Sequence, residues 1–104
     1  MADPDLLAML VASPCCLPGL AEDELFPKYR ELGFSKYEGF SEWAACRHTW
    51  EDSPGRCRAR AGKAGLCFTS YHLPPLEDDI EQSLARALEA ARFASLLGAG
   101  LVLF

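Results

Sequence analysis

Residues 66–104, LCFTSYHLPPLEDDIEQSLARALEAARFASLLGAGLVLF, contain two apolar runs separated by a long helical pattern. The first run, Leu66–Tyr71, is followed by His72 and two prolines, and the last run is Leu101–Phe104. The residues of the apolar helical face, which we expect to pack on a sheet, are Ile80, Leu84, Ala87, Leu88, Ala91 and Ala94. Gly98 follows them as a typical helix stop. The order strand, helix, strand over this length predicts a parallel βαβ unit.

The preceding residues repeat this order. We expect strands at Leu7–Ala12 and Lys36–Ser41, and helices at about 23–32 and 54–64. The four strands begin about 30 residues apart, which is the usual length of a βαβ unit. The predicted fold class is therefore α/β, with the parallel order βαβαβαβ.

The crossovers also predict a barrel. Right-handed crossovers place all the helices on one face of the sheet and leave the other face uncovered. A (β/α)8 TIM barrel fills that face with side chains from its remaining strands. Because the sequence stops at an apolar strand, we expect residues 1–104 to form one partial domain, the first half of a truncated TIM barrel.

Composition narrows the class of protein. The chain has 104 residues, 50% of them hydrophobic, and a net charge of −5, which is typical of one globular domain. An acidic balance disfavours a nucleic-acid partner, which needs a basic surface. The longest apolar stretches fall far short of the roughly 20 residues that span a bilayer. We therefore expect no membrane partner and a cytoplasmic location.

Polar residues at the carboxyl ends of the strands are the candidates for a site, because active sites of parallel α/β folds gather there. Glu38 lies within the second predicted strand, where a carboxylate needs a partner or a place at the mouth of a site. A salt bridge beneath a loop would satisfy it equally well. Trp43 follows the same strand and would either line a substrate pocket or pack within its loop.

His72 follows the third predicted strand and is held by the proline turn. An imidazole there serves as a metal ligand, a substrate contact or an acid/base group, or as a hydrogen-bonded loop residue. Cys46, His48 and Cys57 are also suitable zinc ligands by type, but they lack the paired-cysteine spacing of a zinc site, which disfavours that assignment.

These motifs together resemble a known family. The segments that carry the resemblance are Glu31-Leu32-Gly33-Phe34, Tyr37-Glu38, Tyr71-His72-Leu73-Pro74 and Leu97-Gly98-Ala99. In this order they are similar to the start of a xylose isomerase-like TIM barrel, the superfamily of sugar phosphate isomerases and epimerases. The resemblance covers the whole chain but only about half of such a barrel.

The resemblance implies a divalent-metal-dependent sugar or sugar-phosphate isomerase or epimerase as the complete protein. It implies substrate contacts at Glu38, His72 and Trp43, with His72 also a candidate metal ligand, and it leaves the catalytic residues unassigned. The expected metal is Mn, Mg, Co or Zn. Most of the family's metal ligands come from later strands, so we expect this chain alone to bind no metal and to be inactive.

Two alternatives remain open. One is a fragment of an endonuclease IV-like, metal-dependent phosphodiesterase, against which the acidic charge weighs. The other is a small non-enzymatic α/β interaction domain. A partial barrel would expose two sheet edges, so it would be expected to self-associate through them.

Overall fold

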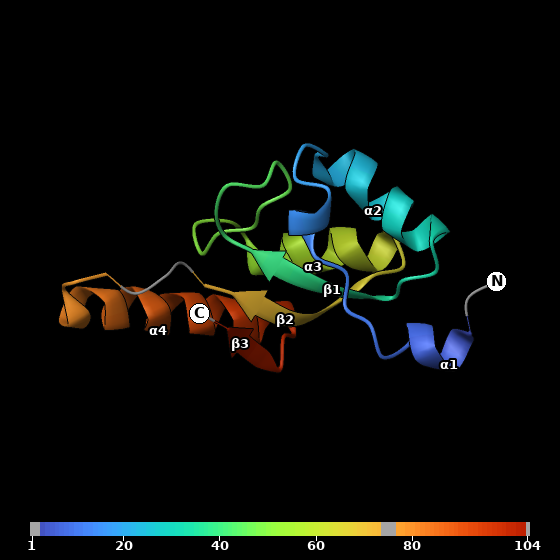
Figure 1. Cartoon of the computed structure of the whole chain (residues 1–104). Helices are drawn as coiled ribbons and strands as arrows, with labels where there is room; N and C mark the ends of the chain where they lie inside the picture. The colour runs from blue at the N-terminus through green and yellow to red at the C-terminus, as the bar shows by residue number, and fades with distance from the viewer. Residues whose placement is uncertain (1–2, 74–76, 104) are drawn as a thin grey trace.

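The computed structural model describes residues 3–73 and 77–103, which form an α/β fold with a three-stranded parallel sheet (Figure 1). The elements in chain order are α1 (Pro4–Leu7), the 3-10 turn η1 (Pro14–Cys16), α2 (Glu22–Glu31), β1 (Lys36–Phe40), α3 (Pro54–Lys63), β2 (Cys67–His72), α4 (Ile80–Leu97) and β3 (Leu101–Leu103). The predicted parallel α/β class is confirmed. Of the features named above, Pro74 and Phe104 lie outside the described residues.

The strands lie in the order β1-β2-β3 and all run parallel. The register between β1 and β2 shifts after Tyr37, which pairs with Phe68, because Glu38 pairs with Ser70. Thr69 is therefore an extra residue on β2, as in a β-bulge. A parallel sheet of this kind needs a crossover between each pair of strands, and α3 and α4 supply the two crossovers.

The predicted first strand, Leu7–Ala12, is wrong except at its end. Asp3 accepts a hydrogen bond from the backbone N–H of Asp5, and Pro4 stands at the start of a helix, so this segment opens with the helical turn α1. Only Ala12 pairs with the sheet: its N–H donates to Lys36 O at 3.0 Å, and its carbonyl accepts from the N–H of Glu38 at 2.8 Å. An apolar run predicts a buried strand only where both of its faces are covered, and most of this run is exposed.

Helices α2 and α3 form close to where their sequence signals predict. Ser53 accepts a hydrogen bond from the backbone N–H of Arg56, and Pro54 occupies the first turn of α3. Helix α2 spans Glu22–Glu31 with Pro27 inside it, so the proline does not delay its start. Gly33 ends that segment with φ at 100°, a left-handed conformation that favours glycine.

The buried face of α4 is not the predicted one. The residues of α4 that are buried are Ser83, Ala90, Phe93, Ala94 and Leu97. Of the predicted packing face, Ala94 is buried, but Ile80, Leu84 and Leu88 are exposed. The helix has two adjacent apolar stripes, and the stripe with the large Phe93 is the one that packs on the sheet. Within residues 3–73 and 77–103, no helix is both long enough and apolar enough to cross a membrane.

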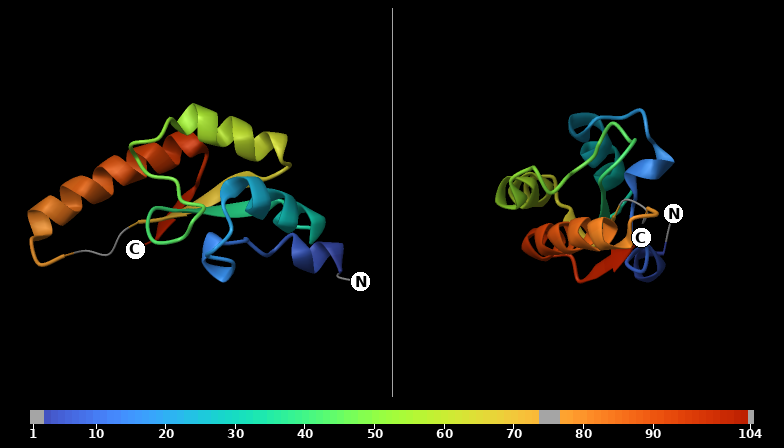
Figure 2. Two further views of the ribbon diagram at one scale, coloured as in Figure 1. Left: turned by 90° about the horizontal axis from the view of Figure 1, so that it is seen from above. Right: turned by 90° about the vertical axis from the view of Figure 1, so that its left-hand side faces the viewer.

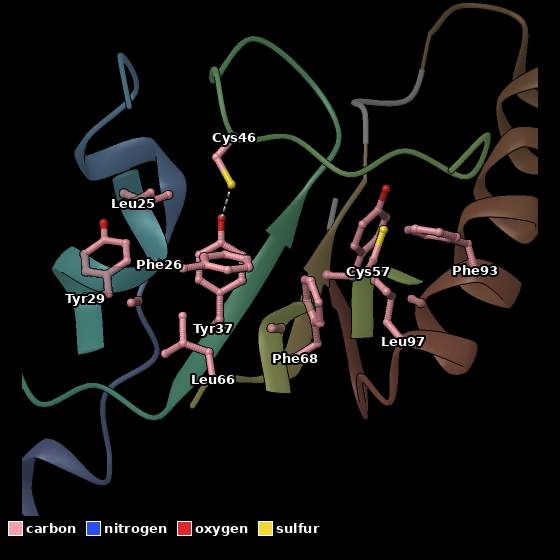
Figure 3. Packing of buried hydrophobic residues seen from close by; sticks show 14 of the residues in the cluster. Leu25, Phe26, Tyr29, Tyr37, Cys46, Cys57, Leu66, Phe68, Phe93 and Leu97 are labelled. Atoms are coloured by element: carbon pink, nitrogen blue, oxygen red, sulfur yellow. Dashed lines mark hydrogen bonds between the residues drawn. The ribbon is translucent and has the colours of Figure 1, made fainter. Parts of the chain in front are cut away.

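The core lies between the sheet and the helices α2, α3 and α4 (Figure 2). Figure 3 shows Tyr37 of β1 at the centre of this core. Its ring packs edge-on against Phe26 of α2, with centroids 5.0 Å apart, and against Phe68 of β2, 5.5 Å apart. The ring of Tyr71 on β2 packs against Phe93 of α4 at 5.5 Å. Aromatic side chains thus join α2, α4 and the sheet into one cluster, to which α3 adds the buried Cys57 and Ala61.

Candidate functional site

The sheet presents one face to the helices and a second face away from them. Tyr37 faces the helices, and successive side chains of a strand point to opposite faces, so Glu38 and Phe40 lie on the second face. The register then places His72 opposite Phe40. The sequence-predicted residues Glu38 and His72 therefore share the face of the sheet opposite to the one on which α2 and α4 pack.

An aromatic cluster stands at the carboxyl ends of β1 and β2. The ring of Phe40 lies 5.4 Å from the ring of Trp43, at 73°, and 5.5 Å from the ring of His72, at 46°. Phe40 is buried, whereas Trp43 is 63% exposed. The hydroxyl of Ser41 donates to the backbone carbonyl of His72 at 3.4 Å and ties the two strand ends together. We call Phe40, Trp43 and His72 the strand-end cluster.

His72 keeps an unused polar atom in this cluster. Its Nδ1 is buried and has no hydrogen-bond partner among the described residues. A buried polar atom without a partner is costly, so a hydroxyl that reached this nitrogen would be bound favourably. An exposed aromatic face beside a hydrogen-bonding group is the kind of surface that holds a small polar ligand with apolar C–H faces. The strand-end cluster therefore has the composition of a pocket wall.

Glu38 is a more distant member of this face. It pairs with Ser70, two residue pairs before the Phe40–His72 pair along the sheet, and it is partly exposed. In the described part of the chain, no ion pair or side-chain hydrogen bond holds its carboxylate. The salt bridge that would have given Glu38 a purely structural role is thus not found among those residues.

A second polar cluster, on the helix side of the sheet, has no counterpart in the sequence prediction. Nε2 of His48 lies 2.7 Å from Oε1 of Glu22, and Nε of Arg60 donates to Oε2 of the same carboxylate at 2.6 Å. Burial raises the pKa of Glu22, but the hydrogen bonds from Arg60 and His48 outweigh it and hold the pKa below 4.5. His48 is only 2% exposed. Because Glu22 precedes its partners by 26 and 38 residues, no local spacing in the sequence could have revealed the cluster.

This second cluster positions the segment between β1 and α3. The N–H of His48 donates to Phe40 O at 2.8 Å, and the hydroxyl of Tyr71 donates to His48 O at 2.5 Å. Burial raises the pKa of Tyr71 well above its ordinary value, so the hydroxyl remains a donor. These bonds hold His48 against the end of β1 and against β2, and Trp43 lies in the segment between Phe40 and His48. The helix-side cluster of Glu22, His48 and Arg60 therefore fixes one end of the segment that carries Trp43.

The cysteines contribute no metal centre to the described structure. The hydroxyl of Tyr37 and the thiol of Cys46 form a hydrogen bond of 3.3 Å (Figure 3), and burial raises the pKa of Cys46 to about 11. Burial also raises the pKa of Cys57. A zinc ligand is a thiolate, which these environments disfavour.

The remaining metal candidate is His72. Across residues 3–73 and 77–103, no three side chains of His, Cys, Asp or Glu gather closely enough to hold a metal ion. A single imidazole does not make a divalent-metal site. The residues described here do not fit such a site, and we assign no reaction step to a metal.

Of the comparisons with known proteins, the one with solved structures gives a match. No family model matches this chain, and no curated protein matches it. Among solved structures, a xylose isomerase domain-containing protein from Salmonella typhimurium LT2 superimposes with a TM-score of 0.71 and 24% sequence identity. The match covers 89% of this chain and 35% of the Salmonella chain. The chain therefore has the xylose isomerase-like fold that its motifs resemble, over a span consistent with part of a TIM barrel.

Proposed function

We propose that this chain forms one wall of the substrate site of a sugar or sugar-phosphate isomerase or epimerase. The observation that carries the proposal is the strand-end cluster, in which the exposed ring of Trp43 and the ring of His72 both lie against Phe40. Within the cluster, Nδ1 of His72 has no hydrogen-bond partner among the described residues. In this assignment Trp43 packs against the apolar C–H face of the sugar. His72 exchanges a hydrogen bond with a hydroxyl, and Glu38 contacts the substrate further along the same face.

Two further facts support the proposal. The cluster lies at the carboxyl ends of parallel strands, where α/β folds place their sites. The fold is also that of a xylose isomerase domain, and the chain spans 35% of the matched Salmonella protein. The wall needs the rest of a barrel to enclose a substrate, so the isomerase activity belongs to the complete protein and we expect none from this chain alone. The divalent metal implied by the resemblance would take its ligands from residues outside those described.

The proposal is tested by sugar binding to the wall itself. The chain has two tryptophans, Trp43 and Trp50, whose indole N–H signals can be followed separately by NMR after assignment by substitution. Titration with aldopentoses and ketohexoses, with and without phosphate, should shift the Trp43 signal saturably at millimolar concentrations. The Trp50 signal, from a ring packed against the core, should stay in place.

The His72→Ala variant gives the matched control. It should retain the Trp43 signal but lose most of the sugar-dependent shift, because the hydrogen-bonding partner is gone. Glycerol at equal concentration should produce no saturable shift, since it has no ring face to stack. If Trp43 responds to no sugar, or responds equally in the His72→Ala variant, the proposed wall is wrong.

A further inference from the structure

Strand β2 contains two buried polar atoms that have no hydrogen-bond partner among the described residues, Nδ1 of His72 and the hydroxyl oxygen of Thr69. The other threonine of the chain, Thr49, accepts a hydrogen bond from the backbone N–H of Glu51 at 3.3 Å. A buried hydroxyl without a partner lowers the stability of a fold. Packing therefore does not account for the hydroxyl of Thr69, which lies in the middle of a strand.

The bulge of β2 determines the face on which this hydroxyl lies. Phe68 and Tyr71 both face the helices, and Thr69 and Ser70 lie between them. Thr69 alternates with Phe68, and Ser70 pairs with Glu38, so both side chains point to the face opposite to the one on which α2 and α4 pack. Thr69 and Glu38 therefore share this face.

Thr69 and Glu38 lie below the strand-end cluster on the sheet. Thr69 and Ser70 together oppose Glu38, two residue pairs before the Phe40–His72 pair. At about 3.3 Å per residue, they lie about 7 Å from that pair along the strands. Thr69 and Glu38 are both half-buried, and no ion pair holds Glu38 within the described part of the chain. A ligand that extends from the cluster along this face meets these two side chains next.

The two side chains are complementary to one kind of ligand group. A carboxylate only accepts hydrogen bonds, whereas a threonine hydroxyl can donate one. A sugar hydroxyl can donate to the carboxylate and accept from the threonine at the same time, whereas a phosphate group is repelled by the carboxylate charge. We infer that Thr69 is a further substrate-binding residue, whose hydroxyl donates to a sugar hydroxyl that in turn donates to Glu38. The inference rests on the proposed function and adds that a hydroxyl-bearing part of the sugar, not a phosphate, binds here.

Thr69→Val provides the test, because it replaces the hydroxyl with a methyl group and keeps the β-branched shape that suits a strand. In the NMR titration of the Trp43 signal with aldopentoses, this variant should bind about three to ten times more weakly than wild type. Its urea midpoint should rise, because the unpaired polar atom is gone. A hydroxyl with only a structural role would give a lower midpoint and unchanged affinity.

Two variants provide the controls. Thr69→Ser keeps the hydroxyl and should bind aldopentoses about as tightly as wild type. Thr49→Val removes the other threonine hydroxyl, which has a partner and lies outside the sheet. It should leave the affinity unchanged and should not raise the urea midpoint.

Monodeoxy analogues of the aldopentose identify the contact itself. Wild type and Thr69→Val should bind one analogue with equal affinity, namely the one that lacks the hydroxyl bound by Thr69, because the substitution then removes no hydrogen bond. An equal loss of affinity with every analogue would overturn the inference, as would a Thr69→Val variant that binds aldopentoses as tightly as wild type. A wild-type chain that binds no sugar would overturn the proposed function, and this inference with it.

Discussion

Gly39 of β1 lies opposite Tyr71 of β2, and a Cβ atom on Gly39 would stand 2.6 Å from Cδ1 of the tyrosine ring. The ring fills the space that a side chain on the neighbouring strand would occupy. Tyr71 in turn packs on Phe93 and donates its hydroxyl to His48 O. The missing side chain at Gly39 therefore allows one ring to connect the sheet, α4 and the segment before α3.

Gly39→Ala should destabilise the chain by about 1–3 kcal/mol, since the added methyl overlaps a buried ring that cannot leave its core position. The free energy of unfolding in urea measures the effect. Gly62→Ala in α3 is the matched control, because nothing lies within 4 Å of its Cβ position, and it should stabilise by about 0.5–1 kcal/mol. Equal effects at both positions would show that the Gly39–Tyr71 contact does not constrain the sheet.

Glu22→Gln should destabilise the chain by about 1–2 kcal/mol at neutral pH, because the carboxylate accepts charged hydrogen bonds from Arg60 and from His48. The pKa of Glu22 is lowered in the folded state, so its contribution is present above pH 4.5 and is lost as the pH falls through the lowered value. The difference in unfolding free energy between wild type and variant should therefore narrow in acid.

The exposed Glu24, in the same first turn of α2, provides the control for that experiment. Glu24→Gln removes the same charge from the helix N-terminus without breaking the helix-side cluster, so its effect should stay below about 0.5 kcal/mol. A pH-independent difference for Glu22→Gln would contradict the hydrogen bonds assigned to the Glu22 carboxylate.

Four of the five thiols should react in two groups, and the half-buried Cys15 belongs to neither. Cys16 and Cys67 are exposed, whereas Cys46 and Cys57 are buried and their pKa values are raised, that of Cys46 to about 11. Because the thiolate is the reactive form, iodoacetamide at pH 8 should label the exposed pair in the folded chain. Labelling of Cys46 and Cys57 should require urea. Peptide mass spectrometry distinguishes the sites, and early modification of Cys46 would show that its bond to Tyr37 is open.

Trp43→Ala should abolish sugar binding while leaving the free energy of unfolding of the chain nearly unchanged. The side chain is 63% exposed, so its loss should change the free energy of unfolding by less than about 0.5–1 kcal/mol. The sugar-dependent shift of a neighbouring signal, such as the His72 ring protons, should nevertheless disappear. A variant that unfolds more readily by several kcal/mol would assign Trp43 to loop packing instead.

The sequence predicted the parallel α/β class because the segments after residue 35 carry local signals. Ser53-Pro54 starts a helix, Gly65 and Gly98 end helices with positive φ, and the strands between them are apolar. Each of these signals depends on interactions within a few residues, so it can be recognised from the local sequence alone. The run Leu7–Ala12 has the same composition as a strand, but pairing is a long-range property, and here only Ala12 pairs.

The candidate site was predictable to a similar degree. Trp43 and His72 were predicted from their places after strands, and the structure brings both of them against Phe40. Glu38 was predicted from its place within a strand, and it lies in the middle of β1 on the same face. The helix-side cluster could not be predicted. Glu22, His48 and Arg60 meet only after α2 and α3 have packed, and their separation in sequence contains no signal of that contact.

Thr69, the extra residue of β2, has a consequence for how the site is encoded. Phe68 and Tyr71 both face the helices although they are three positions apart, which the bulge alone permits. If residues 68–72 formed a regular strand with no bulge, strict alternation from Phe68 would turn Tyr71 away from the helices and His72 toward the core. The strand end would then offer the phenol of Tyr71 to a ligand in place of the imidazole of His72. One extra residue in the strand thus determines which chemical group this fold presents.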